Sequence, residues 1–130
     1  MDGFGFATDT LIGGLNQPNP AGDDWIAFFR DQRLLYMAGE ALRWGNLPAA
    51  LMARIEVLAG RLADWIPRAS RPALIHGDIW GGNILCRDGR VAAFIDPAIY
   101  NAEPEIELAF ATLFATFGTP FFARYRDIRP

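Results

Sequence analysis

The N-terminal half of the chain repeats its apolar positions every three or four residues, which is the spacing of one face of a helix. The first such stretch begins after Asp23, a residue suited to cap a helix N-terminus, contains Trp25, Phe28 and Phe29 on one face, and ends near Gly45. The second stretch follows Pro48 with spacings of +4, +3, +4 and +3, through Leu51, Ile55, Leu58, Leu62 and Trp65. We therefore predict two helices whose apolar faces form part of a hydrophobic core.

The spacing of the apolar residues changes after residue 72, where short apolar runs alternate with turn residues. Residues 73–76 and 83–86 predict strands on either side of a glycine-rich loop, and residues 90–96 predict a strand that returns antiparallel after the turn "RDG". The pair Asp96-Pro97 ends that strand, because proline cannot donate a hydrogen bond to a sheet. This part of the chain therefore predicts a small β-hairpin with polar loops at its ends.

Helical spacing returns in the last third of the chain. A helix is predicted from near Glu103 to a cap at Gly118, and a shorter one over residues 120–128. The inward face of the first would hold Ile106, Phe110, Leu113 and Phe117. By contrast, residues 1–22 are rich in Gly, Asn and Pro and predict an irregular lead-in. We thus expect an α+β fold: a mainly helical domain over residues 23–130 with one small hairpin.

Composition removes several classes of function. The 130 residues, 52% of them apolar, suit one small domain, and a net charge of −3 with scattered arginines disfavours nucleic acid as a partner. No apolar run is long enough to span a membrane. One His and one Cys are too few for a Cys/His zinc site, and a chain without lysine contains no Walker-A phosphate loop. The single cysteine fits a reducing, cytoplasmic location, whereas the oligomeric state stays open.

Candidate chemistry lies in the stretch "LIHGDIWGGNIL", residues 74–85. Asp78 and Asn83 stand at opposite ends of its glycine-rich loop, and Asp96 ends the strand that returns beside it. Carboxylate and amide oxygens suit magnesium, which takes one or two protein carboxylates together with phosphate and water. The other carboxylate could orient a hydroxyl and accept its proton. The spacing His-x-Asp-x-x-x-x-Asn, then a strand ending in Asp, is the pattern of protein-kinase-like phosphotransferases.

Simpler interpretations remain for each residue. Asp78 and Asn83 are also common turn formers, and Asp96 before proline could merely end a strand. His76 is more typical of a hydrogen-bonded structural histidine than of a general base, and Trp80 could belong to the core. Only the combined spacing of these residues favours catalysis.

The segments "HGDIWGGNIL", "FIDPAIY" and "FFARYRDIRP" resemble the fructosamine kinase (ketosamine-3-kinase) family, relatives of aminoglycoside phosphotransferases and choline kinases. The elements Gln-Pro-Asn, Asp-Trp and Phe-Phe near the N-terminus strengthen the resemblance, which covers nearly the whole chain. It implies the C-terminal lobe of a protein-kinase-like fold. It also implies an enzyme of protein deglycation, which transfers the γ-phosphate of ATP to a sugar hydroxyl of a free or protein-bound ketosamine.

The resemblance also implies individual roles. Asp78 would be the catalytic base, while Asn83 and Asp96 would bind magnesium and, through it, ATP. Trp80 would contact the substrate. His76 and Glu105 would support the loop from behind. Glu105 is one of two acids, the other being Glu107, in the first turn of a predicted helix.

Two departures from the family pattern lead to a further expectation. Such kinases carry a glycine-rich cover over ATP and a lysine on a preceding strand, which a chain without lysine cannot supply, and they normally continue beyond "YRDIRP". We therefore expect residues 1–22 to lead in from a missing lobe and the catalytic lobe to be truncated, so that the piece alone would be inactive. An aminoglycoside or choline-type kinase lobe and a non-catalytic remnant remain alternatives.

Overall fold

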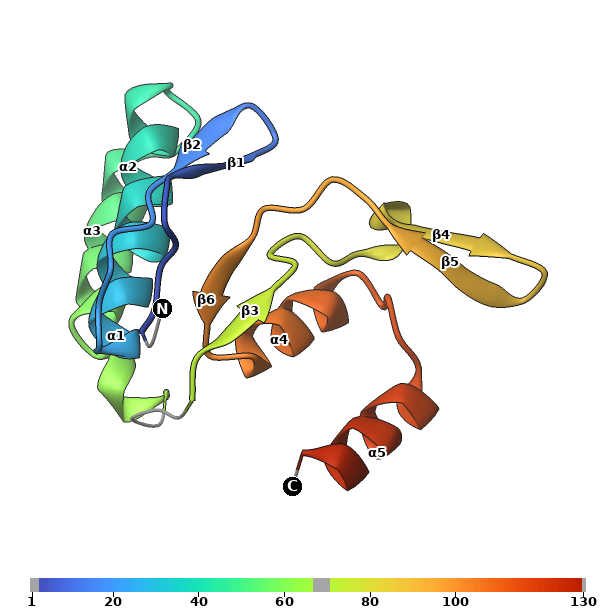
Figure 1. Ribbon diagram of the computed structural model, residues 1–130. Coiled ribbons are helices and arrows are strands. Elements are labelled where there is room, and N and C mark those ends of the chain that lie inside the picture. The colour runs from blue at the N-terminus through green and yellow to red at the C-terminus, as the bar shows by residue number, and fades with distance from the viewer. Residues whose placement is uncertain (1–2, 67–70, 130) are drawn as a thin grey trace.

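The computed structural model describes residues 3–66 and 71–129 (Figure 1). Helices α1, α2 and α3 form one side, the strands β3 and β6 with helix α4 form the middle, and the hairpin β4–β5 projects from it. Helix α5 lies at the far end, with the C-terminus. The mixture of helices and small sheets confirms the predicted α+β class.

The first predicted helix is continuous but not uniform. It comprises α1 (Trp25–Phe29), a wider π-helical segment (Arg30–Leu35) and α2 (Tyr36–Arg43). Its N-cap is Asp24 and not the predicted Asp23, because the Asp24 carboxylate accepts a hydrogen bond from the Ala27 N–H at 3.0 Å.

The second predicted helix ends earlier than its apolar spacing indicated. Helix α3 (Ala49–Ala59) is followed by Gly60 and a short 3₁₀ turn (Leu62–Asp64), which packs side chains at a different period. Leu62 is buried, but Leu58 is 46% and Trp65 70% exposed. The prediction that the whole stripe enters the core was therefore wrong for its outer members.

The N-terminal segment is structured, contrary to the prediction of an irregular lead-in. Strands β1 (Thr10–Ile12) and β2 (Leu15–Gln17) pair antiparallel around Gly13, which adopts a positive φ of 55°. Strands of three residues contain too few alternations to give a period-two signal, so the hairpin was not visible in the sequence.

The predicted central hairpin is confirmed. Strand β4 (Ile84–Arg87) pairs antiparallel with β5 (Arg90–Phe94) around a turn at Asp88-Gly89, where both residues have positive φ. Strand β3 (Ala73–Ile75) was also predicted, but it pairs with β6 (Tyr100–Ala102), a strand that the sequence did not reveal. The loop between β3 and β4 therefore connects two separate sheets.

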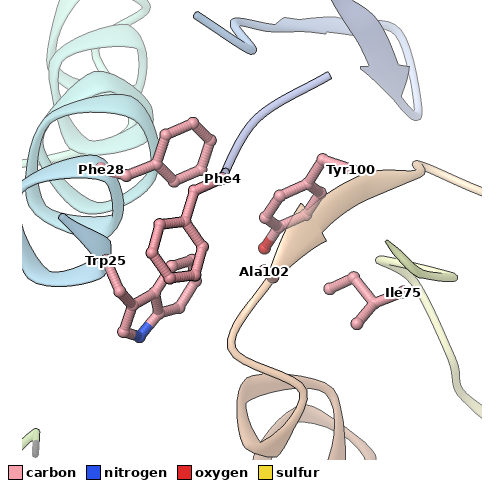
Figure 2. Close-up of a cluster of buried hydrophobic side chains, with 6 residues drawn as sticks. All are labelled: Phe4, Trp25, Phe28, Ile75, Tyr100 and Ala102. Carbon is pink, nitrogen blue, oxygen red and sulfur yellow. The ribbon is translucent and has the colours of Figure 1, made fainter. Parts of the chain in front are cut away.

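One core joins the N-terminal segment, the first helix and the central sheet. Its buried members are Phe4, Trp25, Phe28, Ile75, Tyr100 and Ala102 (Figure 2). Backbone bridges from Phe4 to Gly22 and from Gly5 to Asn101 hold the N-terminal segment in place. This segment thus forms part of the scaffold beneath the candidate site.

The last two helices are α4 (Glu105–Leu113) and α5 (Thr119–Ile128). Helix α4 ends before Gly118, which instead precedes α5 as its N-cap, and Leu113 is 77% exposed and not inward. Within residues 3–66 and 71–129, every helix is too short or too polar to cross a lipid bilayer.

Candidate functional site

The loop between β3 and β4 takes a tight path that only glycine allows at one point. Gly77 has a φ of +82°, and a Cβ added there would come within 2.1 Å of the carbonyl oxygen of Ala98. The close approach brings the segment after Asp96 directly against the start of the loop. The glycine of the sequence "HGD" is therefore required for two reasons: the backbone has a positive φ at this position, and no room is left for a side chain.

Asp78 and Asn83 meet across this loop. The Nδ2 group of Asn83 donates to the backbone oxygen of Asp78 at 2.8 Å and to its carboxylate Oδ2 at 3.0 Å. Asn83 is only 6% exposed, whereas Asp78 is half-buried. The pair leaves the carboxylate with acceptor capacity for another partner and leaves Asn83 Oδ1 as an acceptor for a cation or a donor.

His76 ties the loop to the end of strand β5. Its Nε2 lies 3.0 Å from the carbonyl oxygen of Ile95, and its Nδ1 accepts from the Asp78 N–H at 3.3 Å. These two contacts are satisfied together by a neutral imidazole protonated at Nε2. This geometry agrees with the predicted role of His76 as a support of the loop.

The segment that carries Asp96 is held beside the loop on both sides. The Ile95 N–H donates to the Asn83 carbonyl at 3.0 Å, and the Ala98 N–H donates to the His76 carbonyl at 2.8 Å. Asp96 itself is exposed and has a φ of +54°, a conformation that aspartate tolerates better than most residues. The backbone thus holds the neighbours of Asp96 against the loop that contains the Asp78–Asn83 pair, and the convergence of the three side chains on one point stays a prediction.

The donor set at this position, one carboxylate and one amide, is compatible with a magnesium ion that also takes phosphate and water ligands. Among the residues that the structure describes, no three His, Cys, Asp or Glu side chains gather as a metal-binding group. Asn83 and Asp96 offer oxygen atoms, and magnesium commonly takes one or two protein carboxylates while keeping water and phosphate ligands. These residues therefore fit a magnesium ion that arrives with a phosphate group.

The acid that supports the loop is Glu107, whereas the sequence prediction named Glu105. The Glu107 carboxylate accepts the N–H groups of Gly77 at 2.7 Å and His76 at 3.1 Å. Glu105 is exposed and lines a groove between α4 and α5, together with Thr112 and Arg129. Both acids lie in the first turn of α4, so sequence position alone did not show which one faces the loop.

Trp80 belongs to an aromatic surface beside the pair. It is 41% exposed, its ring lies over Gly82, and its centroid is 6.0 Å from that of Phe114. Phe114 in turn lies 5.1 Å from Phe110. Exposed aromatic rings next to a carboxylate offer a surface for an apolar or cationic arm of a ligand.

Comparison with known proteins places this geometry in one family. A family model described as fructosamine kinase matches residues 1–130. A protein named "Probable ketoamine kinase" from Synechocystis sp. is 38% identical over 98% of this chain, and one from Vibrio cholerae is 35% identical over 98%. The chain covers 42% and 43% of these two relatives, so it spans about two-fifths of their length.

Solved structures agree with the sequence comparison. A protein from Thermobifida fusca assigned as a fructosamine-3-kinase superposes with a TM-score of 0.81, 32% identity and coverage of 88% of this chain and 39% of its own. Another structure with the same assignment, from Haemophilus somnus, superposes with a TM-score of 0.82 and 29% identity. The match covers 100% of this chain and 43% of that protein. The kinase-like fold predicted from the sequence is therefore confirmed.

Proposed function

Because this chain belongs to the fructosamine kinase family, we propose that it carries the catalytic loop of a phosphotransferase. The donor is ATP, and the acceptor is a sugar hydroxyl of a ketosamine, free or attached to a protein amine. The observation that carries the proposal is the contact between Asn83 and the Asp78 carboxylate.

The chemistry assigns a distinct task to each carboxylate. The acceptor oxygen forms a bond to the γ-phosphorus while the bond from that phosphorus to the bridging oxygen of ADP breaks. Asp78 orients the hydroxyl and accepts its proton, because its carboxylate is half-buried and held by Asn83, and no basic side chain of the described residues forms an ion pair with it. Asn83 keeps the base in one orientation.

Asn83 and Asp96 would hold magnesium, whose charge neutralises the phosphate oxygens when it is bound. Their backbones are already joined through Ile95, so the two ligands need little reorganisation to act together. The exposure of Asp96 leaves its carboxylate accessible to a phosphate-bound ion.

Trp80 and Phe114 would receive the amine-bearing arm of the acceptor. Both rings are exposed and border the Asp78–Asn83 loop, and aromatic faces attract cationic amines. A reaction that consumes ATP is expected in the cytoplasm. The free, exposed thiol of Cys86 is compatible with that compartment, because the cytoplasm keeps thiols reduced.

The test is a phosphorylation assay on the full natural protein with magnesium and ATP, offering a fructosyl-amine, an aminoglycoside and choline as acceptors. We expect transfer to the fructosyl-amine, and we expect Asp78→Asn to abolish it without changing the melting temperature. Transfer to the aminoglycoside or choline alone would reassign the acceptor. Absence of transfer to all three would reject the proposed activity and favour a non-catalytic role.

A further inference from the structure

The side chain of Gln17 connects the N-terminal hairpin to the segment that follows Asp96. Gln17 is 1% exposed, and its Nε2 donates to the Ala98 carbonyl at 3.0 Å and to the Thr10 hydroxyl oxygen at 3.0 Å. Both of its N–H bonds are therefore used, one inside the hairpin and one far along the chain. Turning this amide would leave buried donors without partners, so its orientation is fixed.

Ala98, the residue that Gln17 holds, is also in contact with the catalytic loop. Its N–H donates to the His76 carbonyl at 2.8 Å, and its own carbonyl oxygen lies so close to Gly77 that no side chain fits between them. A shift of this peptide unit would therefore disturb the loop and the segment containing Asp96 together.

The dipeptide Asp96-Pro97 thus lies between two anchored residues. Ile95 is anchored to His76 and Asn83, which belong to the loop itself. Ala98 is anchored to His76 and to Gln17, and Gln17 belongs to another element, strand β2. The Thr10 hydroxyl, on the paired strand β1, donates to the Ile99 carbonyl at 3.3 Å, so the hairpin reaches this segment through two side chains. Of these two, Gln17 is the one that binds Ala98, the residue in contact with the loop.

The anchor behind Gln17 is itself firmly held. The Thr10 hydroxyl oxygen also accepts from Asn19 Nδ2 at 2.9 Å, and Asn19 Oδ1 accepts from the buried Arg33 at 2.6 Å. A chain of buried and partly buried polar contacts therefore runs from Arg33 to Ala98. Each amide of this chain is held at both ends, which restrains the Gln17 side chain, although the buried Arg33 Nε has no hydrogen-bond partner among the described residues.

We propose that Gln17 is a positioning residue, which fixes Asp96 relative to the Asp78–Asn83 pair by holding the Ala98 carbonyl. It touches none of these three residues. The inference rests on the proposed function, because the position of Asp96 matters to the reaction only if Asp96 and Asn83 hold magnesium.

The test uses Gln17→Met in the full natural protein, a change that keeps side-chain length and removes both donors. We expect the amide exchange of Ala98, followed by NMR, to accelerate about tenfold more than that of the α1 amides, as for one lost buried hydrogen bond. The magnesium concentration for half-maximal rate should rise and kcat should fall, each on the order of tenfold, while KM for the acceptor changes less than about twofold. Mn²⁺ binding in the presence of ATP, followed by EPR, should weaken in parallel.

Asn101→Ala is the matched control. Asn101 Nδ2 donates to the Gly5 carbonyl at 3.1 Å, so this variant also removes a bond between the N-terminal segment and the strand region, but at strand β6 and not at Ala98. It should lower the melting temperature without changing the magnesium dependence or the Ala98 exchange. If Gln17→Met fails to fold, Gln17→Asn, whose amide is one methylene too short to reach Ala98, replaces it.

The inference is overturned if the Gln17 variant leaves Ala98 exchange and magnesium dependence unchanged, or if the Asn101 control alters them equally. Failure of the proposed function has a different signature, since the unmodified protein would then transfer no phosphate. In that case faster Ala98 exchange and weaker Mn²⁺ binding in Gln17→Met still support the positioning role, and their absence rejects it.

Discussion

The guanidinium carbon of Arg33 lies 3.9 Å from the centre of the Tyr100 ring, inside the protein. The same group lies 4.8 Å from the Phe28 ring and donates to the Pro18 carbonyl at 2.7 Å and to Asn19 Oδ1 at 2.6 Å. Burial lowers the pKa of Arg33 from its usual value. No carboxylate among the described residues forms an ion pair with it, so aromatic faces and carbonyl dipoles hold this charge in place.

Replacing Arg33 by lysine should therefore destabilise the protein. A compact ammonium cannot stack on Tyr100 while reaching both oxygen acceptors, so we expect a loss of about 2–4 kcal/mol of unfolding free energy. Urea denaturation of the full natural protein measures it, with Arg30→Lys on the surface as the control. Equal stabilities of the two variants would show that the planar group is unimportant.

Glu107→Gln should reduce activity more than stability. An amide can accept only one of the two loop N–H groups that Glu107 now binds, and its NH₂ group would face the other as a second donor. We expect kcat to fall about 10–100-fold, with a stability loss of about 1–3 kcal/mol. Steady-state kinetics check this, and Glu105→Gln is the matched control from the same helical turn, for which near-normal activity is expected. Comparable losses in the two variants would contradict the distinction between these acids.

The sequence indicated the position of the candidate site in the fold better than it indicated the residues that support it. The spacing of His76, Asp78, Asn83 and Asp96 was informative because these residues lie in one loop and one hairpin, where local turn rules fix geometry. The supports come from distant elements: Gln17 from a hairpin too short to show a period, and Glu107 from a turn that holds two acids. Local periodicity contains no information about such long-range contacts.

The limits of apolar spacing are clearest in the helices. Trp25 and Phe28 enter the core as predicted, because strand β6 and Phe4 pack on that side. Leu58 and Trp65 share the same kind of spacing but remain exposed, since α3 packs against α2 and the π-helical segment and then ends at Gly60. Spacing predicts a face, but the partners in the tertiary structure decide whether that face is buried.

Asp9 should make stability depend on pH in the acid range. Hydrogen bonds from the Asn19 N–H at 3.0 Å and then from Asn16 Nδ2 at 3.1 Å lower the pKa of its carboxyl. A group with a lowered pKa contributes stability that is present above its unfolded pKa, about 3.9, and is lost as pH falls through the lower folded value. The melting temperature of wild type should therefore exceed that of Asp9→Asn at pH 6, and the gap should narrow below about pH 4. A gap that stays constant from pH 6 to pH 2 would contradict this assignment.

Gly82→Ala should test whether Trp80 serves as a binding surface. A Cβ at position 82 would come within 2.3 Å of the Trp80 ring, so the ring must move, while the Asp78–Asn83 contact needs no change. We expect KM for a fructosyl-amine to rise about 10-fold with kcat reduced less than about 3-fold, because the variant alters the surface for the arm and not the base. Gly81→Ala, where an added Cβ meets no atom within 4 Å, is the control and should behave like wild type. A fall in kcat at constant KM would instead show that the Trp80 ring supports the catalytic loop and does not contact the acceptor.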